Sequence, residues 1–148
     1  MQQIMQFISH HWVLVLFAVL AFIWVIVEEA RRQAGGSTSI NPQETIYKMN
    51  HEEAIILDIR DSALFVEGHI TGAINLPKKE LEADVKKLEK YRAKPIIIVC
   101  RSGRTAVDAL SLLKKNNFDK LYLLTGGMEA WNNAGLPLVK GAKDNGKN

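Results

Sequence analysis

A single cysteine opens a short polar loop whose residues could carry nucleophilic chemistry. Cys100 is the only cysteine among the 148 residues, and it ends an apolar run in the stretch PIIIVCRSGRTA, residues 95–106. Arg101 and Arg104 add two positive charges, and Gly103 allows backbone angles that would turn the loop amides inward. Cations and free amides at a helix start stabilise a thiolate, which is the nucleophilic form of cysteine. On its own, a cysteine that ends a strand is more often a small buried apolar residue, so the flanking arginines and glycine decide for chemistry.

The elements around this loop indicate an α/β domain with a central parallel sheet. Short apolar runs predict buried strands at residues 54–59, 95–100 and 120–124. Helical spacing is expected from residue 42 for about two turns, around residues 81–88, from 106 to 113 and from 127 to 134. Asn41 and Glu44 have the spacing of a capping box at the first of these helices. Because ligands bind beyond the carboxyl ends of strands in such sheets, Cys100 stands at a predicted ligand site.

An apolar segment near the N-terminus has the properties of a membrane anchor. Residues 12–27 contain no charged or strongly polar side chain, and a helix over residues 4–27 would be about 36 Å long, enough to cross a ~30 Å hydrocarbon core. Trp12 and Trp24 lie toward the ends, as interfacial aromatic residues do. A signal peptide would need a basic start and a small-residue cleavage site, and a core helix is seldom apolar all round. We therefore expect the lipid bilayer to be a partner through residues 4–27.

The flanking charges predict how this segment is oriented. No Lys or Arg precedes it, whereas Arg31 and Arg32 follow it closely, and positive residues tend to stay in the cytoplasm. We expect a single-pass protein of a bacterial inner membrane, with its N-terminus outside and its C-terminal domain in the cytoplasm, where a thiol stays reduced. The predicted division is a transmembrane helix at 1–30, a linker at 31–38, a domain at 39–140 and a disordered tail at 141–148.

Composition argues against nucleic-acid binding and against a metal site. The formal net charge is only +3. A group of lysines at residues 78–90 alternates with Glu80, Glu82, Asp84 and Glu89, so it is interpreted as the solvated face of a helix. One cysteine and four scattered histidines offer no ligand set, and we expect neither a metal nor a cofactor.

Three stretches in a fixed order resemble one family. They are ILDIRDSALFVEGHITGAINLP at residues 56–77, IIIVCRSGRTA at 96–106 and LTGGMEAWNNAGLPL at 124–138. Together they resemble a single rhodanese domain, the sulfurtransferase fold, over residues 39–140. The resemblance implies a three-layer rhodanese-like α/β domain with a central parallel sheet, here preceded by one transmembrane helix.

The resemblance also implies a reaction. Cys100 would attack the outer sulfur of a small anionic donor such as thiosulfate, hold it as a persulfide and pass it to cyanide or to a thiol, including a protein thiol. The implied substrate-binding residues are those of the loop: Arg101, Ser102, Gly103, Arg104 and Thr105. Asp58 and Arg60 would either brace this loop or form a plain structural ion pair. His69 is expected to hold a turn through hydrogen bonds, without acting as a base.

Two other functions compete with this interpretation. Phosphatases related to this fold have an arginine six residues after the cysteine, where this chain has Ala106, so the loop is sized for a sulfur atom. A docking module that binds a partner, such as a membrane protein, is the second alternative; the intact Cys100 and its arginines favour the enzyme. Leu64 stands where many family members have an acidic residue, and Thr105 where many have arginine, and both departures bear on the choice of donor.

Overall fold

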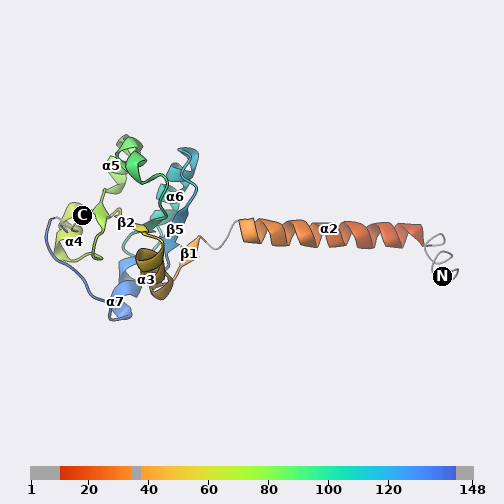
Figure 1. The fold of residues 1–148 in the computed structure, drawn as a ribbon, viewed down its shortest axis with the longest axis horizontal. Helices are drawn as coiled ribbons and strands as arrows, with labels where there is room; N and C mark the ends of the chain where they lie inside the picture. Colours follow the sequence, from red (N-terminus) through yellow and green to blue (C-terminus); the bar gives the residue numbers. More distant parts are fainter. Residues whose placement is uncertain (1–10, 35–37, 143–148) are drawn as a thin grey trace. The chain divides into compact units, whose positions relative to one another are not determined.

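The computed structural model describes residues 11–34 and 38–142, and the chain divides into two compact units, Met1–Ser37 and Thr38–Asn148. The first unit contains helix α2, Trp12–Ala34 (Figure 1). Large apolar side chains are exposed along this helix, from Val13 to Val27.

The predicted transmembrane helix is not supported by the described part of the chain. Within residues 11–34 and 38–142, no helix combines the length and the apolar character needed to cross a bilayer. The apolar run of α2 covers residues 12–27, about 24 Å of helix against a core of ~30 Å, and the sequence of 28–34 is mainly polar. Residues 4–10 of the prediction, residues 35–37 of the linker and residues 143–148 of the tail lie outside the described residues.

The second unit is built on a five-stranded parallel sheet, which confirms the predicted α/β class. The strands lie in the order β1-β5-β4-β2-β3, and every neighbouring pair is parallel. Their bounds are Ser39–Ile40 for β1, Ile55–Asp58 for β2, Ile74–Asn75 for β3, Ile96–Val99 for β4 and Leu121–Leu124 for β5. The central strand β4 is therefore flanked on both sides, and all four of its residues are buried.

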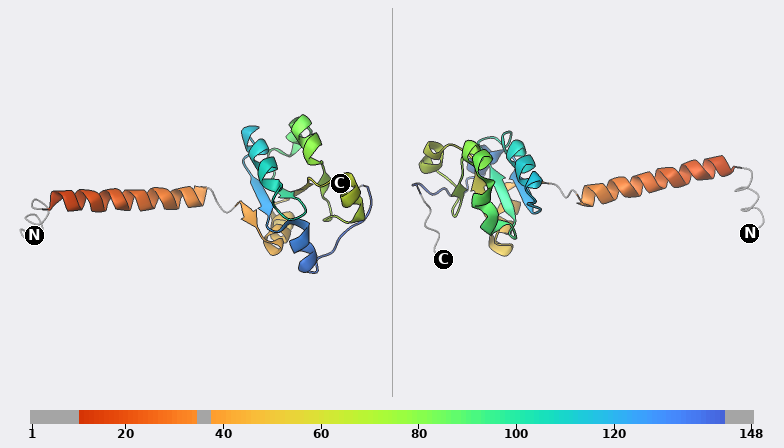
Figure 2. Two further views of the ribbon diagram at one scale, coloured as in Figure 1. Left: turned by 180° about the vertical axis from the view of Figure 1, so that it is seen from behind. Right: turned by 90° about the horizontal axis from the view of Figure 1, so that it is seen from above.

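Helices cover both faces of the sheet and complete three layers (Figures 1 and 2). One face is covered by α5, η1 and α6, and the other by α3, α4 and α7. Their bounds are Pro42–His51 for α3, Ser62–Glu67 for α4, Lys78–Ala83 for α5, Val85–Tyr91 for the 3₁₀-helix η1, Ala106–Lys115 for α6 and Gly127–Asn133 for α7.

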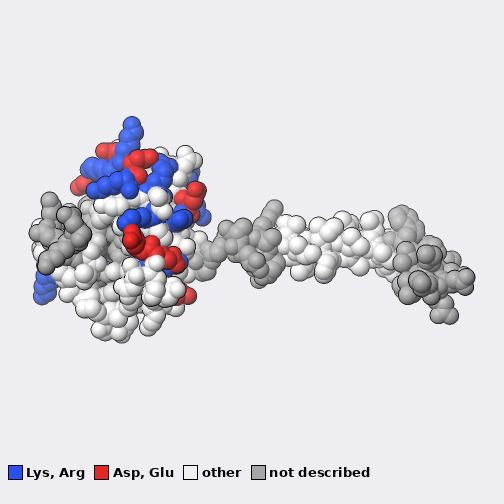
Figure 3. All heavy atoms as spheres, in the orientation of Figure 1, with Lys and Arg blue, Asp and Glu red and all other residues white. Residues whose placement is uncertain are grey.

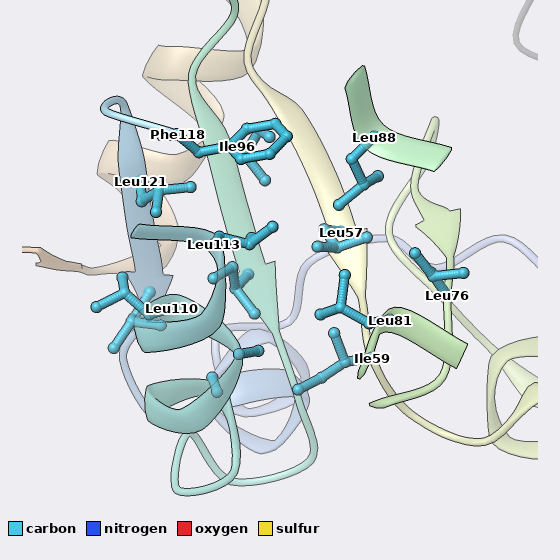
Figure 4. Close-up of a cluster of buried hydrophobic side chains, with 14 of the residues drawn as sticks. Leu57, Ile59, Leu76, Leu81, Leu88, Ile96, Leu110, Leu113, Phe118 and Leu121 are labelled. Atoms are coloured by element: carbon cyan, nitrogen blue, oxygen red, sulfur yellow. The ribbon is translucent and has the colours of Figure 1, made fainter. Parts of the chain in front are cut away.

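Alternate residues of β2, β4 and β5 supply the two apolar cores. Ile96 and Ile98 pack with Leu110 and Leu113 of α6, whereas Ile97 lies in the opposite core. Figure 4 shows the first of these cores, with leucines of α5, η1 and α6 directed at the strands. Because strand side chains alternate in direction, a strand buried on both faces is a continuous apolar run, as the sequence indicated.

Local chemistry explains where several elements begin. Asn41 accepts a hydrogen bond from the Glu44 amide at 2.8 Å, and Glu44 accepts one from the Asn41 amide at 2.9 Å, so the capping box of α3 is confirmed. The continuous helix expected around residues 81–88 is wrong. At Asp84 the backbone leaves helical angles (φ −150°), and its side chain accepts from the Lys86 amide, so α5 ends and a 3₁₀-helix starts.

Candidate active site

The single cysteine of the chain lies at the carboxyl end of the central strand. Cys100 follows β4 directly and is 2% exposed. Asp58, the last residue of β2, pairs with Val99 in the sheet register, so the ends of these two strands lie beside each other. The parallel sheet thus brings the Asp-x-Arg stretch and the cysteine loop to one edge, as ligand sites of such sheets require.

Gly103 gives the loop its curled conformation. Its φ of +88° lies in the region that favours glycine, and its amide donates a hydrogen bond to Cys100 Sγ at 2.9 Å. The side chains of Arg101, Ser102, Arg104 and Thr105 are exposed, and α6 begins immediately after Thr105. The predicted inward-facing amide is present at Gly103, where it contacts the sulfur that would bear the negative charge.

The first residues of α7 form hydrogen bonds with the backbone of the cysteine loop. The amide of Met128 donates to the Cys100 carbonyl at 2.9 Å, and the amide of Glu129 donates to the Arg101 carbonyl at 3.1 Å. Gly127 has a φ of +57°, and a Cβ at this position would lie 2.3 Å from the Cys100 carbonyl oxygen. The close approach of α7 to the loop therefore requires glycine at this position. This role was not predicted from the sequence, although the Gly126-Gly127 pair was a signal for it.

Asp58 and Arg60 form a buried ion pair. Arg60 Nε donates to both carboxylate oxygens at 3.0 Å, and Nη2 donates to Oδ2 at 2.6 Å and to the Gly68 carbonyl at 2.8 Å. The side chains are 1% and 10% exposed, respectively. These hydrogen bonds tie the end of β2 to the turn before His69, and support of the cysteine loop by this pair stays a prediction.

His69 lies in the interior beside this turn. Its ring stacks on Phe65 with centroids 3.7 Å apart, and its Nδ1 lies 2.8 Å from the Phe65 carbonyl oxygen. The backbones of His69 and Val139 exchange two hydrogen bonds, at 2.9 and 2.8 Å. His69 therefore fastens the closing segment of the domain, in accordance with the structural role that was expected.

A pocket of about 190 Å³ opens above the cysteine. Its lining combines three cations, one carboxylate and several apolar groups: Ile59, Arg60, Asp61, Leu64, Lys78, Cys100, Arg101 and Thr105. Of the residues predicted to bind substrate, Arg101 and Thr105 line it, whereas Ser102, Gly103 and Arg104 belong to the loop outside its lining. Ile59, Asp61, Leu64 and Lys78 were not predicted, because they reach the pocket from other elements.

The described residues offer no alternative metal centre. Over residues 11–34 and 38–142, no group of three or more histidine, cysteine, aspartate or glutamate side chains is arranged to hold a metal ion.

Known proteins are similar to this chain over the whole or part of its length. Residues 41–134 match the family model described as a rhodanese-like domain. The uncharacterized protein YibN from Escherichia coli strain K12 is 34% identical over 142 residues, which cover 95% of this chain and 99% of YibN. The thiosulfate sulfurtransferase GlpE from Shewanella oneidensis is 38% identical over 79 residues, 53% of this chain and 76% of GlpE. Among solved structures, a rhodanese-related protein from Thermoplasma volcanium matches with a TM-score of 0.62 and 28% identity, over 68% of this chain and 96% of that one.

Proposed function

This chain belongs to the rhodanese-like domain family, and on that premise we propose that it is a sulfurtransferase that carries sulfane sulfur on Cys100. The observation that carries the proposal is the Gly103 amide, which donates to Cys100 Sγ at the base of a small pocket with cationic side chains. An amide aimed at Sγ stabilises the negative charge of the Cys100 thiolate, both before the attack and when the sulfur has been passed on. The similarity to a thiosulfate sulfurtransferase supports the same reaction class.

The proposed reaction has two displacement steps. The Cys100 thiolate attacks the outer sulfur of thiosulfate; a new S–S bond forms to Cys100, the S–S bond of the donor breaks, and sulfite leaves with the bonding electrons. The persulfide then gives its terminal sulfur to cyanide or to a thiolate acceptor, and the Cys100 thiolate returns. No oxidant or reductant is consumed, because sulfane sulfur is passed from one nucleophile to another.

The loop length supports a sulfur substrate over a phosphate. A loop with arginine six residues after its cysteine would need that cation at position 106, but Ala106 is fully buried in the first turn of α6. The amide of Gly103 donates to Sγ at 2.9 Å, so the loop curls closely around the sulfur atom of Cys100.

The test is thiocyanate formation by the purified full chain from thiosulfate and cyanide. We expect activity that is lost in Cys100→Ser, and one added sulfur atom on Cys100 by mass spectrometry after incubation with thiosulfate alone. Lys115→Gln serves as the control, because this exposed residue at the end of α6 does not line the pocket. If Cys100→Ser leaves the cellular function intact while loss of the N-terminal segment abolishes it, a docking module is the better description.

Membrane attachment is a separate part of the proposal and rests on the sequence. The exposed apolar side chains of α2 need an apolar environment, and the apolar residues upstream of α2 would lengthen the run to residues 4–27. We propose a single pass through a bacterial inner membrane, with the C-terminal domain in the cytoplasm. Membranes washed with alkaline carbonate should retain the chain, and a reporter that works only in the cytoplasm should be active when fused after Asn148. Recovery of the chain in the wash, or an inactive reporter, would contradict attachment and orientation respectively.

A further inference from the structure

Lys78 reaches the candidate active site from outside the cysteine loop. It is the first residue of α5, and its amide donates to the Ile59 carbonyl at 3.2 Å, so its backbone is fixed beside the end of β2. Its side chain lines the same pocket as Cys100 and is 34% exposed. The pocket therefore has a cation whose position is set by β2 and α5, independently of the loop.

A carboxylate on the neighbouring helix orients this lysine. Lys78 Nζ donates to Asp108 Oδ2 at 2.7 Å, and Glu82 lies further away at 3.9 Å. The hydrogen bond that Lys78 donates to Asp108 raises the pKa of Lys78, so the ammonium group stays charged throughout the neutral range. Asp108 lies in the first turn of α6, which starts directly after the cysteine loop, so the contact connects Lys78 to the loop region.

The other charges of the pocket are less able to attract an anion. The guanidinium of Arg60 is paired with the buried Asp58 carboxylate at 2.6 Å, which offsets its charge. Arg101 is 80% exposed and lies 3.6 Å from Glu129, so solvent and this carboxylate screen it. Asp61 contributes a negative charge to the same lining. Lys78 is also paired, but its partners Asp108 and Glu82 are 68% and 55% exposed and lie outside the pocket lining, so solvent screens these carboxylates more than the buried Asp58 beside Arg60.

Lys78 differs from the other lysines on the surface around α5, because it lines the pocket. Figure 3 shows Lys and Arg over the part of the domain that contains α5, with Asp and Glu interleaved among them. Lys87 pairs with Glu80 at 3.5 Å in this region, away from the pocket lining. Lys79, next in sequence to Lys78, is exposed and does not line the pocket, so it offers a matched comparison.

We infer that Lys78 is the residue that makes this pocket selective for anionic sulfur donors over uncharged ones, with Asp108 as its positioning residue. The inference rests on the proposed function, because donors matter only if sulfur is transferred. The effect of the Lys78 charge on an anion that approaches Cys100 can nevertheless be measured without any sulfur transfer. Cys100 is the only cysteine in the chain, so alkylation at this thiol can be followed in the full-length protein without interference from other thiols.

The experiment compares the rates at which iodoacetate, an anion, and iodoacetamide, which is uncharged, alkylate Cys100. The ratio of the two rates cancels changes in the reactivity of the thiol itself and reports the charge that the reagent meets. We expect Lys78→Gln to lower this ratio about fivefold, the effect of one charge about 6 Å away in a partly solvated pocket. Lys79→Gln should change it less than about twofold because solvent screens that side chain. Lys78→Arg should keep most of the ratio, since it restores the charge.

Activity measurements then separate this inference from the proposed function. Where thiocyanate is formed, Lys78→Gln should raise the KM for thiosulfate with a smaller change in kcat, because the donor is a dianion. A full chain that alkylates normally but never forms thiocyanate would refute the proposed sulfurtransferase, whereas the alkylation ratio would still test Lys78. Equal ratios in Lys78→Gln and Lys79→Gln, with thermal melting of both variants unchanged, would overturn the role of Lys78.

Discussion

Replacing Gly127 by alanine should destabilise the domain and displace the cysteine loop. The added Cβ would lie 2.3 Å from the Cys100 carbonyl oxygen and 2.7 Å from that of Arg101. Ordinary contact begins at 3.4 Å, so loop and helix must separate by about 1 Å. That movement lengthens the hydrogen bonds from the amides of Met128 and Glu129 to the same carbonyl groups, now 2.9 and 3.1 Å.

The size of the effect follows from these two contributions. The left-handed backbone at residue 127 costs an alanine about 1–2 kcal/mol, and two weakened hydrogen bonds cost about 1 kcal/mol each or more if the groups stay buried. The free energy of unfolding should therefore fall by about 3–5 kcal/mol, and the Tm should fall by about 10 °C or more. Because the Cys100 carbonyl must move, the rate of alkylation at Cys100 should change as well.

Gly135→Ala provides the matched control. Gly135 also has a left-handed φ of +67°, but no atom lies within 4 Å of a Cβ built there. This variant should lose about 1 kcal/mol, because the gain from a stiffer unfolded chain offsets part of the strain. Both variants would be compared by denaturant unfolding of the full chain in mild detergent. Equal losses in the two variants would show that the contact of Gly127 with the loop carbonyls is not what requires glycine.

Three further substitutions test other parts of the domain by denaturant unfolding. Asp58→Asn leaves the Arg60 guanidinium buried without its counter-charge and should cost about 3–5 kcal/mol; a loss below about 1 kcal/mol would mean that the pair contributes little. Asn41→Ala removes the capping box of α3 and should cost about 1 kcal/mol, whereas Asn41→Ser should retain most of it. Trp131→Phe removes the hydrogen bond from Nε1 to the Pro137 carbonyl, now 3.1 Å, and should cost about 1–2 kcal/mol; an unchanged midpoint would contradict this.

The parts of the fold that the sequence predicted are those in which local chemistry and burial agree. Strands β2, β4 and β5 have apolar residues on both faces, so they stand out as continuous runs. Helix α3 was predictable because its cap uses side chains three residues apart, Asn41 and Glu44. The two-residue strands β1 and β3 were missed, because two residues cannot show a periodicity and their pairing depends on distant partners.

The prediction of a continuous helix around residues 81–88 was wrong for a different reason. Leu81, Val85 and Leu88 have helical spacing and all contact one core, yet two separate helices present them. Asp84 satisfies the Lys86 amide with its own side chain, and this competes with a continuous helix without disturbing the apolar face. The apolar spacing therefore predicted which side chains are buried, but it did not predict the backbone conformation between them.

Only the part of the candidate site that lies in one continuous stretch of sequence was predictable. Cys100 and Gly103 lie in one short loop, so their relation was visible in the sequence. Leu64 is in α4, which follows β2, and Lys78 is in α5, which follows β3. Both residues reach the pocket because β2 pairs with β4 and β3 pairs with β2 in the sheet. No local pattern carries such information, since it depends on pairing between strands that are some 40 residues apart.

The loop backbone and the pocket wall are held by different elements, which has a consequence for specificity. The loop is fixed by β4, by the left-handed turn at Gly103 and by the amides of α7, whereas Leu64 and Lys78 are presented by α4 and α5. A change at Leu64 or Lys78 therefore alters what the pocket attracts while the amide at the sulfur stays in place. A change at Gly127 acts on the loop instead, because it displaces the carbonyl groups of Cys100 and Arg101, whereas Leu64 and Lys78 belong to other elements. Under the proposed function, we therefore expect donor preference and sulfur activation to be separable, and the alkylation ratio and the alkylation rate of Cys100 measure them one at a time.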